Sequence, residues 1–418
     1  MGRLLSISSA ALLAAGVCCL AALAGGAPAL AAGTVAKDAR LGGDRLRTRF
    51  VTDLSKPVTF QVFTLAEPYR VIIDLPDVKF QLPAGLGRKG RGLVTAYRYG
   101  LIGPGRARIV IDVNAPVLVD KSFVLKPQDG QPARLVIDLI RTDRKTFLAG
   151  LRKRRARQPA ATRKRRADAP AVLPPSAKAP RGKGSKPVIV VDPGHGGVDP
   201  GAISKNGVSE KTIVFAFAKA LHRALSATGR YKVVLTRRID TYVPLRERVA
   251  IARRASGDLF ISIHADSLPR RSAKGVSGAT VYTLSEKASD NEAKALAAKE
   301  NRSDIIAGVD LPKKSDEVTS ILIDLAQRET KNLSIAFADT ILAGLRGTTP
   351  LNKKPHRFAG FAVLKAPDVP SVLVELGYLS NRADEKLLVS RIWRRKVAVA
   401  VTKAVNNYFS KRIARVPF

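Results

Sequence analysis

From residue 187 to residue 408, short apolar runs alternate with longer amphipathic stretches, and this alternation constrains the fold more than any other feature of the chain. Residues 188–191 (Val-Ile-Val-Val) have the composition of a buried strand, and residues 209–226 have the periodicity of a helix. The pattern predicts further strands at 233–236, 259–264, 279–284, 361–364 and 372–376, and further helices at 245–255, 289–301, 318–345 and 383–408. Such an order predicts an α/β domain over residues 187–412, with a mostly parallel sheet flanked by helices.

The region before it, residues 37–142, has an all-β pattern. Short β-branched runs such as residues 71–75 and 108–113 are separated by Pro and Gly turn signals. The phrase at residues 68–75 resembles the phrase at residues 132–139, which favours two related sheets packed as a sandwich. From residue 41 to 140 there is no His and no Cys, so we expect a binding module rather than a catalytic one.

The net charge of +38 is extreme for 418 residues, and it is concentrated between the two predicted domains. Residues 141–186 hold sixteen Lys or Arg and only two acidic residues, interleaved with Ala and Pro. A segment that repels itself and buries nothing is expected to be disordered, so residues 143–186 are predicted to be a linker. A solvated spacer and an attachment to an anionic envelope surface both fit this composition.

The first 32 residues predict export. Residues 4–23 are apolar or small without a charge, and Ala29-Leu30-Ala31 follows as a small-x-small cleavage pattern. A transmembrane anchor or a lipoprotein at Cys18 or Cys19 fits less well than a cleaved signal peptide, and we expect a periplasmic protein. Export also argues against nucleic acid as the anionic partner. Both cysteines of the chain lie in this segment, so no thiolate metal site is expected in the body of the protein.

Two of the four histidines, His195 and His264, stand at the carboxyl ends of predicted strands, where open α/β sheets place ligands. Glu210 begins the helix after His195; alone it could simply complement the positive end of that helix. Together the three offer the His-Glu-His chemistry of a catalytic zinc whose fourth position is left to water. Such an ion would lower the pKa of that water and polarise a carbonyl.

Glu375 is a lone carboxylate within the apolar run 371–376, where burial without a task or a partner would be costly. We interpret it as the general acid/base. His356 precedes the sequence Arg-Phe-Ala-Gly-Phe. It could contact the substrate, or it could be a loop histidine without a function in catalysis.

Several motifs of the chain, taken together, resemble those of a known family. In chain order they are residues 191–197 (VDPGHGG), Glu210, and residues 235–248, 262–266 (SIHAD) and 370–375 (PSVLVE). They resemble the amidase-3 type zinc-dependent N-acetylmuramoyl-L-alanine amidases, and residues 41–140 more loosely resemble the AMIN module that targets such enzymes to the septal wall. The resemblance implies hydrolysis of the amide between N-acetylmuramic acid and the L-alanine of the peptidoglycan stem peptide, in cell separation during division. It also implies one Zn²⁺ per catalytic domain on His195, Glu210 and His264, with Glu375 as catalytic carboxylate.

The segment between residues 284 and 361 predicts regulation. Division amidases of this family carry a helix here that covers the metal, and residues 299–306 look like that region. A carboxylate on such a helix could fill the open position of the zinc, with Glu300 as first candidate and Glu317 as second. By the same resemblance, a LytM-type activator with a degenerate site would withdraw the helix.

Three other functions compete with this one. A zinc peptidase that cuts within the stem peptide could use the same ligands. A wall-binding protein with an inactive hydrolase domain would be expected to lack a ligand or Glu375, and all four residues are present. A nucleic-acid binder lacks support, since the chain has a signal peptide and no aromatic-laced basic motif.

Overall fold

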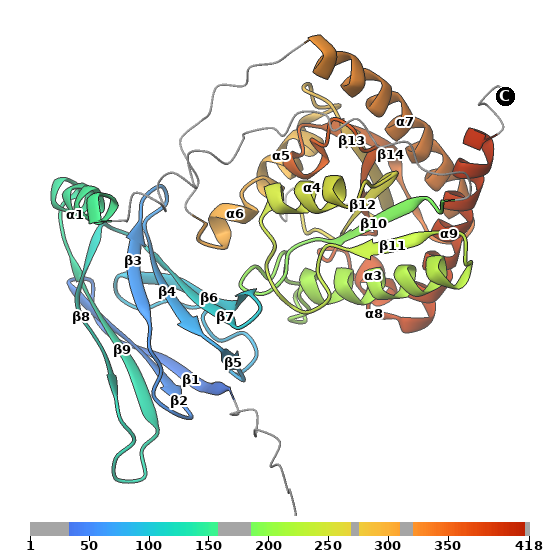
Figure 1. The fold of residues 1–418 in the computed structure, drawn as a ribbon. Helices are drawn as coiled ribbons and strands as arrows, with labels where there is room; N and C mark the ends of the chain where they lie inside the picture. The colour runs from blue at the N-terminus through green and yellow to red at the C-terminus, as the bar shows by residue number, and fades with distance from the viewer. Residues whose placement is uncertain (1–32, 158–184, 269–275, 310–320, 414–418) are drawn as a thin grey trace, which may run out of the picture. The chain divides into compact units, whose positions relative to one another are not determined.

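The computed structural model describes residues 33–157, 185–268, 276–309 and 321–413 (Figure 1). The predicted signal peptide lies outside these residues. The described residues from 34 onward fall into one unit. Among the described residues, no helix combines the length and the apolar character needed to span a membrane.

The N-terminal β module consists of two sheets, as the repeated phrase predicted. One sheet has the order β5-β1-β2-β9-β8 and the other has the order β3-β4-β7-β6. The two similar phrases lie on β4 and β9, one in each sheet, and their apolar side chains meet in a common core that includes Val71, Ile73, Leu135 and Ile137. The strands are β1 (Thr34–Gly43), β2 (Arg47–Leu54), β3 (Gln61–Leu65), β4 (Arg70–Pro76), β5 (Val78–Phe80), β6 (Val94–Gly103), β7 (Arg106–Val113), β8 (Val117–Leu125) and β9 (Ala133–Arg141).

Helix α1 (Arg144–Arg157) corrects the prediction that the structureless linker begins at residue 143. Asp143 starts the helix, because its carboxylate accepts hydrogen bonds from the backbone N–H and the hydroxyl of Thr146. Phe147 is buried and packs edge-on against Tyr69 of the β module, 5.1 Å between ring centroids. One aromatic residue and one cap therefore order the first part of the basic segment; residues 158–184 lie outside the described part.

The C-terminal domain contains a six-stranded sheet of order β11-β10-β12-β15-β13-β14. All neighbouring strands run parallel except β13 and β15, so the predicted mostly parallel sheet is confirmed. Its strands are β10 (Val188–Pro193), β11 (Lys232–Leu235), β12 (Leu259–His264), β13 (Ala279–Leu284), β14 (Leu351–Ala359) and β15 (Ser371–Glu375).

Helices cover both faces of this sheet (Figure 1). Alternate strand residues such as Val191 and Ile261 pack against α3 (Glu210–Ala227), α7 (Ile321–Leu345) and α9 (Arg391–Ile413). The intervening residues, such as Val190 and Phe260, pack against α4 (Leu245–Arg254) and α5 (Asn291–Glu300). The short helices α6 (Ser303–Ile306) and α8 (Arg382–Val389) complete the domain. Burial on both faces explains the unbroken apolar runs that identified the strands.

Two elements differ from the sequence prediction. The strand expected at 361–364 is the 3-10 helix η1 (Ala362–Leu364), and the strand lies earlier, at Leu351–Ala359. That strand is polar and contains Pro355, which an edge strand such as β14 tolerates. The single helix expected at 383–408 is two helices, because Ser390 is extended and its hydroxyl accepts from the Trp393 N–H at the start of α9.

Candidate active site

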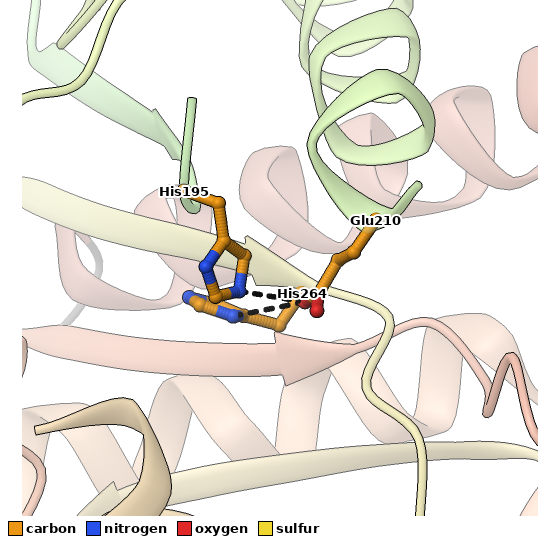
Figure 2. A group of neighbouring side chains, drawn as sticks. All are labelled: His195, Glu210 and His264. Atoms are coloured by element: carbon orange, nitrogen blue, oxygen red, sulfur yellow. Dashed lines mark hydrogen bonds and ion pairs between the residues drawn. The ribbon is translucent and has the colours of Figure 1, made fainter. Parts of the chain in front are cut away.

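The three predicted ligands converge at the carboxyl edge of the sheet (Figure 2). His195 lies in the loop after β10, Glu210 is the first residue of α3, and His264 is the last residue of β12. Glu210 Oε1 lies 3.1 Å from His195 Nε2 and 3.2 Å from His264 Nδ1. All three residues are buried, and each offers one ligand atom within 4.8 Å of the others.

The loop that presents His195 requires both glycine and buried arginine. A Cβ on Gly194 would lie 2.5 Å from the His264 ring, and His195 itself has a left-handed φ of 56°. Arg248, which is 1% exposed, donates to the carbonyl oxygens of Pro193 and His195, at 2.8 Å each. Its charge is balanced by Asp192 at 2.8 Å. The hydrogen bonds from Arg248 thus fix the loop backbone, and with it the position of His195, before any ligand binds.

Neighbouring groups orient His195 and Glu210. Asp199 Oδ2 lies 2.9 Å from His195 Nδ1, so Nε2 is the atom directed into the site. The backbone N–H groups of Ala202 and Ala265 donate to the two oxygens of Glu210. Burial alone would raise the pKa of Asp199, but His195 outweighs it and lowers that pKa to about 2. Carboxylates that remain ionised beside histidines supply the charge that a divalent cation needs.

The donor set fits a metal ion. His195 Nε2 is buried and has no hydrogen-bond partner among the described residues, although Glu210 Oε1 is only 3.1 Å away, because the two atoms lack hydrogen-bond geometry. Glu210 Oε1 does form a hydrogen bond of 3.2 Å with His264 Nδ1. Two imidazole nitrogens and one carboxylate oxygen that meet in a buried site are the donor set of a three-ligand metal centre.

Glu375 lies beside this centre as the last residue of β15, paired with His264 across the parallel ladder. Its side chain is completely buried. Oε2 accepts a hydrogen bond of 2.9 Å from the Asp266 N–H, whereas Oε1 has no partner within the part of the chain that the structure describes. Burial, reinforced by the charges of Glu210 and Asp266, raises the pKa of Glu375 well above its usual value. A carboxylate with one free oxygen and a raised pKa is suited to accept and return a proton.

Glu300, the last residue of α5, also reaches this centre. Its Oε2 lies 3.5 Å from His195 Nε2 and 3.3 Å from His264 Nδ1, and the residue is 5% exposed. Desolvation raises its pKa. The structure therefore brings the first regulatory candidate into the ligand cluster, whereas Glu317 lies outside the described residues.

Side chains around Glu300 fasten the α5–α6 segment (residues 291–308) to the domain. Lys299 pairs with the buried Asp266. The side-chain NH2 group of Asn301 donates to the Gly360 carbonyl, and its side-chain oxygen accepts from the Ala362 N–H.

Helix α6 is held in the same way. The Ser303 hydroxyl donates to Asp199 Oδ2 at 2.5 Å. Asp304 accepts from the Tyr242 hydroxyl and the Leu245 N–H. None of these tethers is predicted by the sequence, because each joins residues far apart in the chain.

His356 is not brought to the centre. It lies on β14, where its Nε2 is 3.2 Å from the Thr283 hydroxyl and its Nδ1 is 3.6 Å from Asp339. Asp199 is a further residue of the site that the sequence prediction does not contain; its position four residues after His195 in a glycine-rich loop is the signal that points to it.

Comparison with known proteins agrees with this geometry. Residues 189–407 match the N-acetylmuramoyl-L-alanine amidase family Amidase_3, and residues 38–139 match the AMIN domain. The chain belongs to the N-acetylmuramoyl-L-alanine amidase family. It is a peptidoglycan amidase with an N-terminal AMIN module, and the resemblance seen in the sequence is confirmed.

Curated relatives include amidases of Neisseria meningitidis and Escherichia coli. The amidase AmiC of Neisseria meningitidis is 34% identical over 385 residues, which cover 90% of each chain. The amidase AmiA of Escherichia coli is 41% identical over 227 residues, 54% of this chain and 77% of that protein. Among solved structures, the amidase AmiC2 of Nostoc punctiforme is 27% identical, with a TM-score of 0.39, and covers 54% of this chain and 98% of its own.

Proposed function

We propose that the enzyme is a zinc-dependent amidase in which His195, Glu210 and His264 hold one Zn²⁺ and Glu375 is the catalytic acid/base. The observation that carries the proposal is the meeting of three buried ligand atoms beside a buried carboxylate with one free oxygen. When bound, the zinc would activate water and polarise the scissile carbonyl.

The residues of the chain have distinct tasks in this reaction. Glu375 Oε1 accepts a proton from the attacking water and returns it to the departing amine of L-alanine. Asp199 keeps Nε2 of His195 turned toward the ion through the contact with Nδ1. The Asp266 N–H holds the second oxygen of Glu375, so that Oε1 remains directed at the reacting atoms.

The structure has the contacts expected of a closed resting state. Glu300 approaches both histidines at the side where a substrate carbonyl and water would need room. An acidic side chain can occupy the open coordination position of a zinc ion and so exclude water. Opening requires a partner that withdraws the α5–α6 segment, and we assign this task to a LytM-type activator. Glu317 remains the second candidate for this blocking carboxylate, which we call the plug.

The surrounding regions fit a periplasmic enzyme that acts in cell separation. Residues 1–32 direct export through a cleaved signal peptide, and the AMIN module at residues 37–142 binds the wall. The basic residues up to 186 contact anionic envelope polymers through charges that salt would screen. Residues 187–412 carry the hydrolysis.

Metal analysis tests the zinc assignment. The purified full chain should contain one zinc per molecule and lose wall hydrolysis in chelator, with recovery on added zinc. His195→Ala and His264→Ala should each lose the stoichiometric zinc, while His222→Ala, on the helix α3, should keep it. Full activity in a demonstrably metal-free preparation would overturn the assignment.

A further inference from the structure

The four-stranded sheet of the β module carries an unusual outer face. Along β4, Val71, Ile73 and Leu75 point into the sandwich core, so Arg70, Ile72 and Asp74 point outward. The register places Ile72 opposite Val110 and Asp74 opposite Arg108. An outer face of a sandwich is ordinarily wet and polar, whereas Ile72 and Val110 are 0% exposed.

The end of the α5–α6 segment covers this face. Ile72 and Val110 share a small apolar cluster with Ala307, Tyr242 and Val198 of the catalytic domain. Gly308 has a left-handed φ of 68°, and a Cβ there would lie 2.6 Å from Ile72 Cδ1. The backbone of the segment therefore lies directly against the sheet, so close that a Cβ at this position would displace the end of the Ile72 side chain.

Three arginines of the same face bind the last carbonyl groups of the segment. Arg70 donates to the Ile305 carbonyl. Arg98 Nε donates to Ile306 O at 2.8 Å, and Arg108 Nη1 donates to Gly308 O at 2.8 Å and to Ala307 O at 3.2 Å. Carbonyl groups at the end of a helix lack partners within it and carry partial negative charge, so cations are the groups that suit them.

Two of these arginines are held in place before they meet the segment. Arg98 forms two bonds with Asp112, at 2.5 and 3.0 Å, and Arg108 forms two bonds with Asp74, at 2.6 and 2.8 Å. Paired, fork-like contacts of this type fix the guanidinium plane. The remaining N–H groups are thereby aimed at the carbonyl oxygens, and little side-chain freedom is lost when the segment binds.

We infer that the AMIN module is a clasp for the α5–α6 segment. By gripping residues 305–308 it keeps the segment, and with it Glu300, against the metal ligands. This inference deepens the proposed closed state and rests on it for its functional consequence. It adds a second task to a module whose other task is to bind the wall, because whatever moves the module away from residues 305–308 also loosens the plug.

The test is the double variant Arg98→Ala/Arg108→Ala in the full chain, without activator. Amide hydrogen exchange should become roughly tenfold faster at residues 303–309. This factor corresponds to the net stabilisation by a single hydrogen bond to a charged group. Hydrolysis of a soluble muramoyl-peptide should rise by a similar factor. A soluble substrate is used so that altered wall binding by the module cannot change the rate.

Arg49→Ala is the matched control. Arg49 makes the same two-bond contact with Asp138, at 2.7 and 2.8 Å, but on the other sheet, and it should change neither readout. Unchanged protection of residues 109–111 in β7 would show that the double variant is folded. Unchanged exchange at residues 303–309 in that folded variant would overturn the clasp. Faster exchange without faster hydrolysis, when Glu300→Ala also has wild-type hydrolysis, would uphold the clasp and refute the closed state instead.

Discussion

The Glu300 carboxylate lies 3.3 Å from the Nδ1 atom of His264, although one residue ends helix α5 and the other ends strand β12. Glu300 is buried. In the proposed mechanism, this contact distinguishes the closed enzyme from the open one. The proposed closure therefore depends on the contacts of the α5–α6 segment and not on a missing catalytic group.

Replacement of Glu300 should therefore increase basal activity. Glu300→Ala without activator is expected to hydrolyse purified wall at least about tenfold faster than the wild type, since the side that the carboxylate occupied becomes available to substrate. Dye release from labelled wall measures the rate. Glu286→Ala, an exposed acidic residue just before α5, is the control and should remain at the basal rate. Equal low rates for all three proteins would remove Glu300 from the mechanism.

Glu375→Gln should separate chemistry from metal binding. The variant keeps the shape of the side chain but cannot accept a proton, so turnover should fall by roughly 10²–10⁴-fold. Zinc content should stay at one per chain, because Glu375 is not among the three ligands. Glu247→Gln, an exposed residue of α4, serves as control. Loss of zinc from Glu375→Gln would show that this carboxylate is a ligand and that its assigned task is wrong.

Asp192 should control the stability of the catalytic domain. Burial opposes its charge, but Arg248 and two hydroxyl donors outweigh that effect, and the pKa of Asp192 is lowered. Asp192→Asn leaves Arg248 buried without its counter-charge, which should cost about 3–5 kcal/mol. Fluorescence of Trp393, the one tryptophan of the chain, reports unfolding of this domain.

The pH dependence of that cost follows from the sign of the shift. A lowered pKa in the folded state means that the stabilisation is complete above the unfolded value of about 4 and is lost as pH falls through the folded value. The difference in stability between wild type and Asp192→Asn should therefore be constant near neutral pH and shrink below about pH 4. A difference that persists unchanged in acid would show that the pair does not act through the charge of Asp192.

Much of the site was readable from the sequence because its parts stand at strand ends. His195, His264 and Glu375 each follow or end an apolar run, and parallel strands bring their carboxyl ends to one edge of the sheet. Glu210 was readable because it starts the helix after the first strand. Only the assignment of helix α5 to the site needed the family resemblance.

Other features could not be read in this way. β14 is polar and contains Pro355, so its pairing depends on the neighbouring strand and not on its own composition. Helix α1 is stabilised by the packing of Phe147 against Tyr69. Ser303 and Asp304 hold the α5–α6 segment through contacts with residues about sixty or more positions away in the sequence. Long-range packing of this type leaves no periodic signal in the chain.

Product analysis tests the central claim most directly. Purified wall should be digested with the full chain, as wild type and as Glu300→Ala, with and without chelator, and the released peptides sequenced by mass spectrometry. The account predicts intact stem peptides that begin with L-alanine, glycan strands whose muramic acid carries a free lactyl carboxylate, and no release in chelator. Peptides that begin at a later residue, with L-alanine left on the glycan, would contradict it.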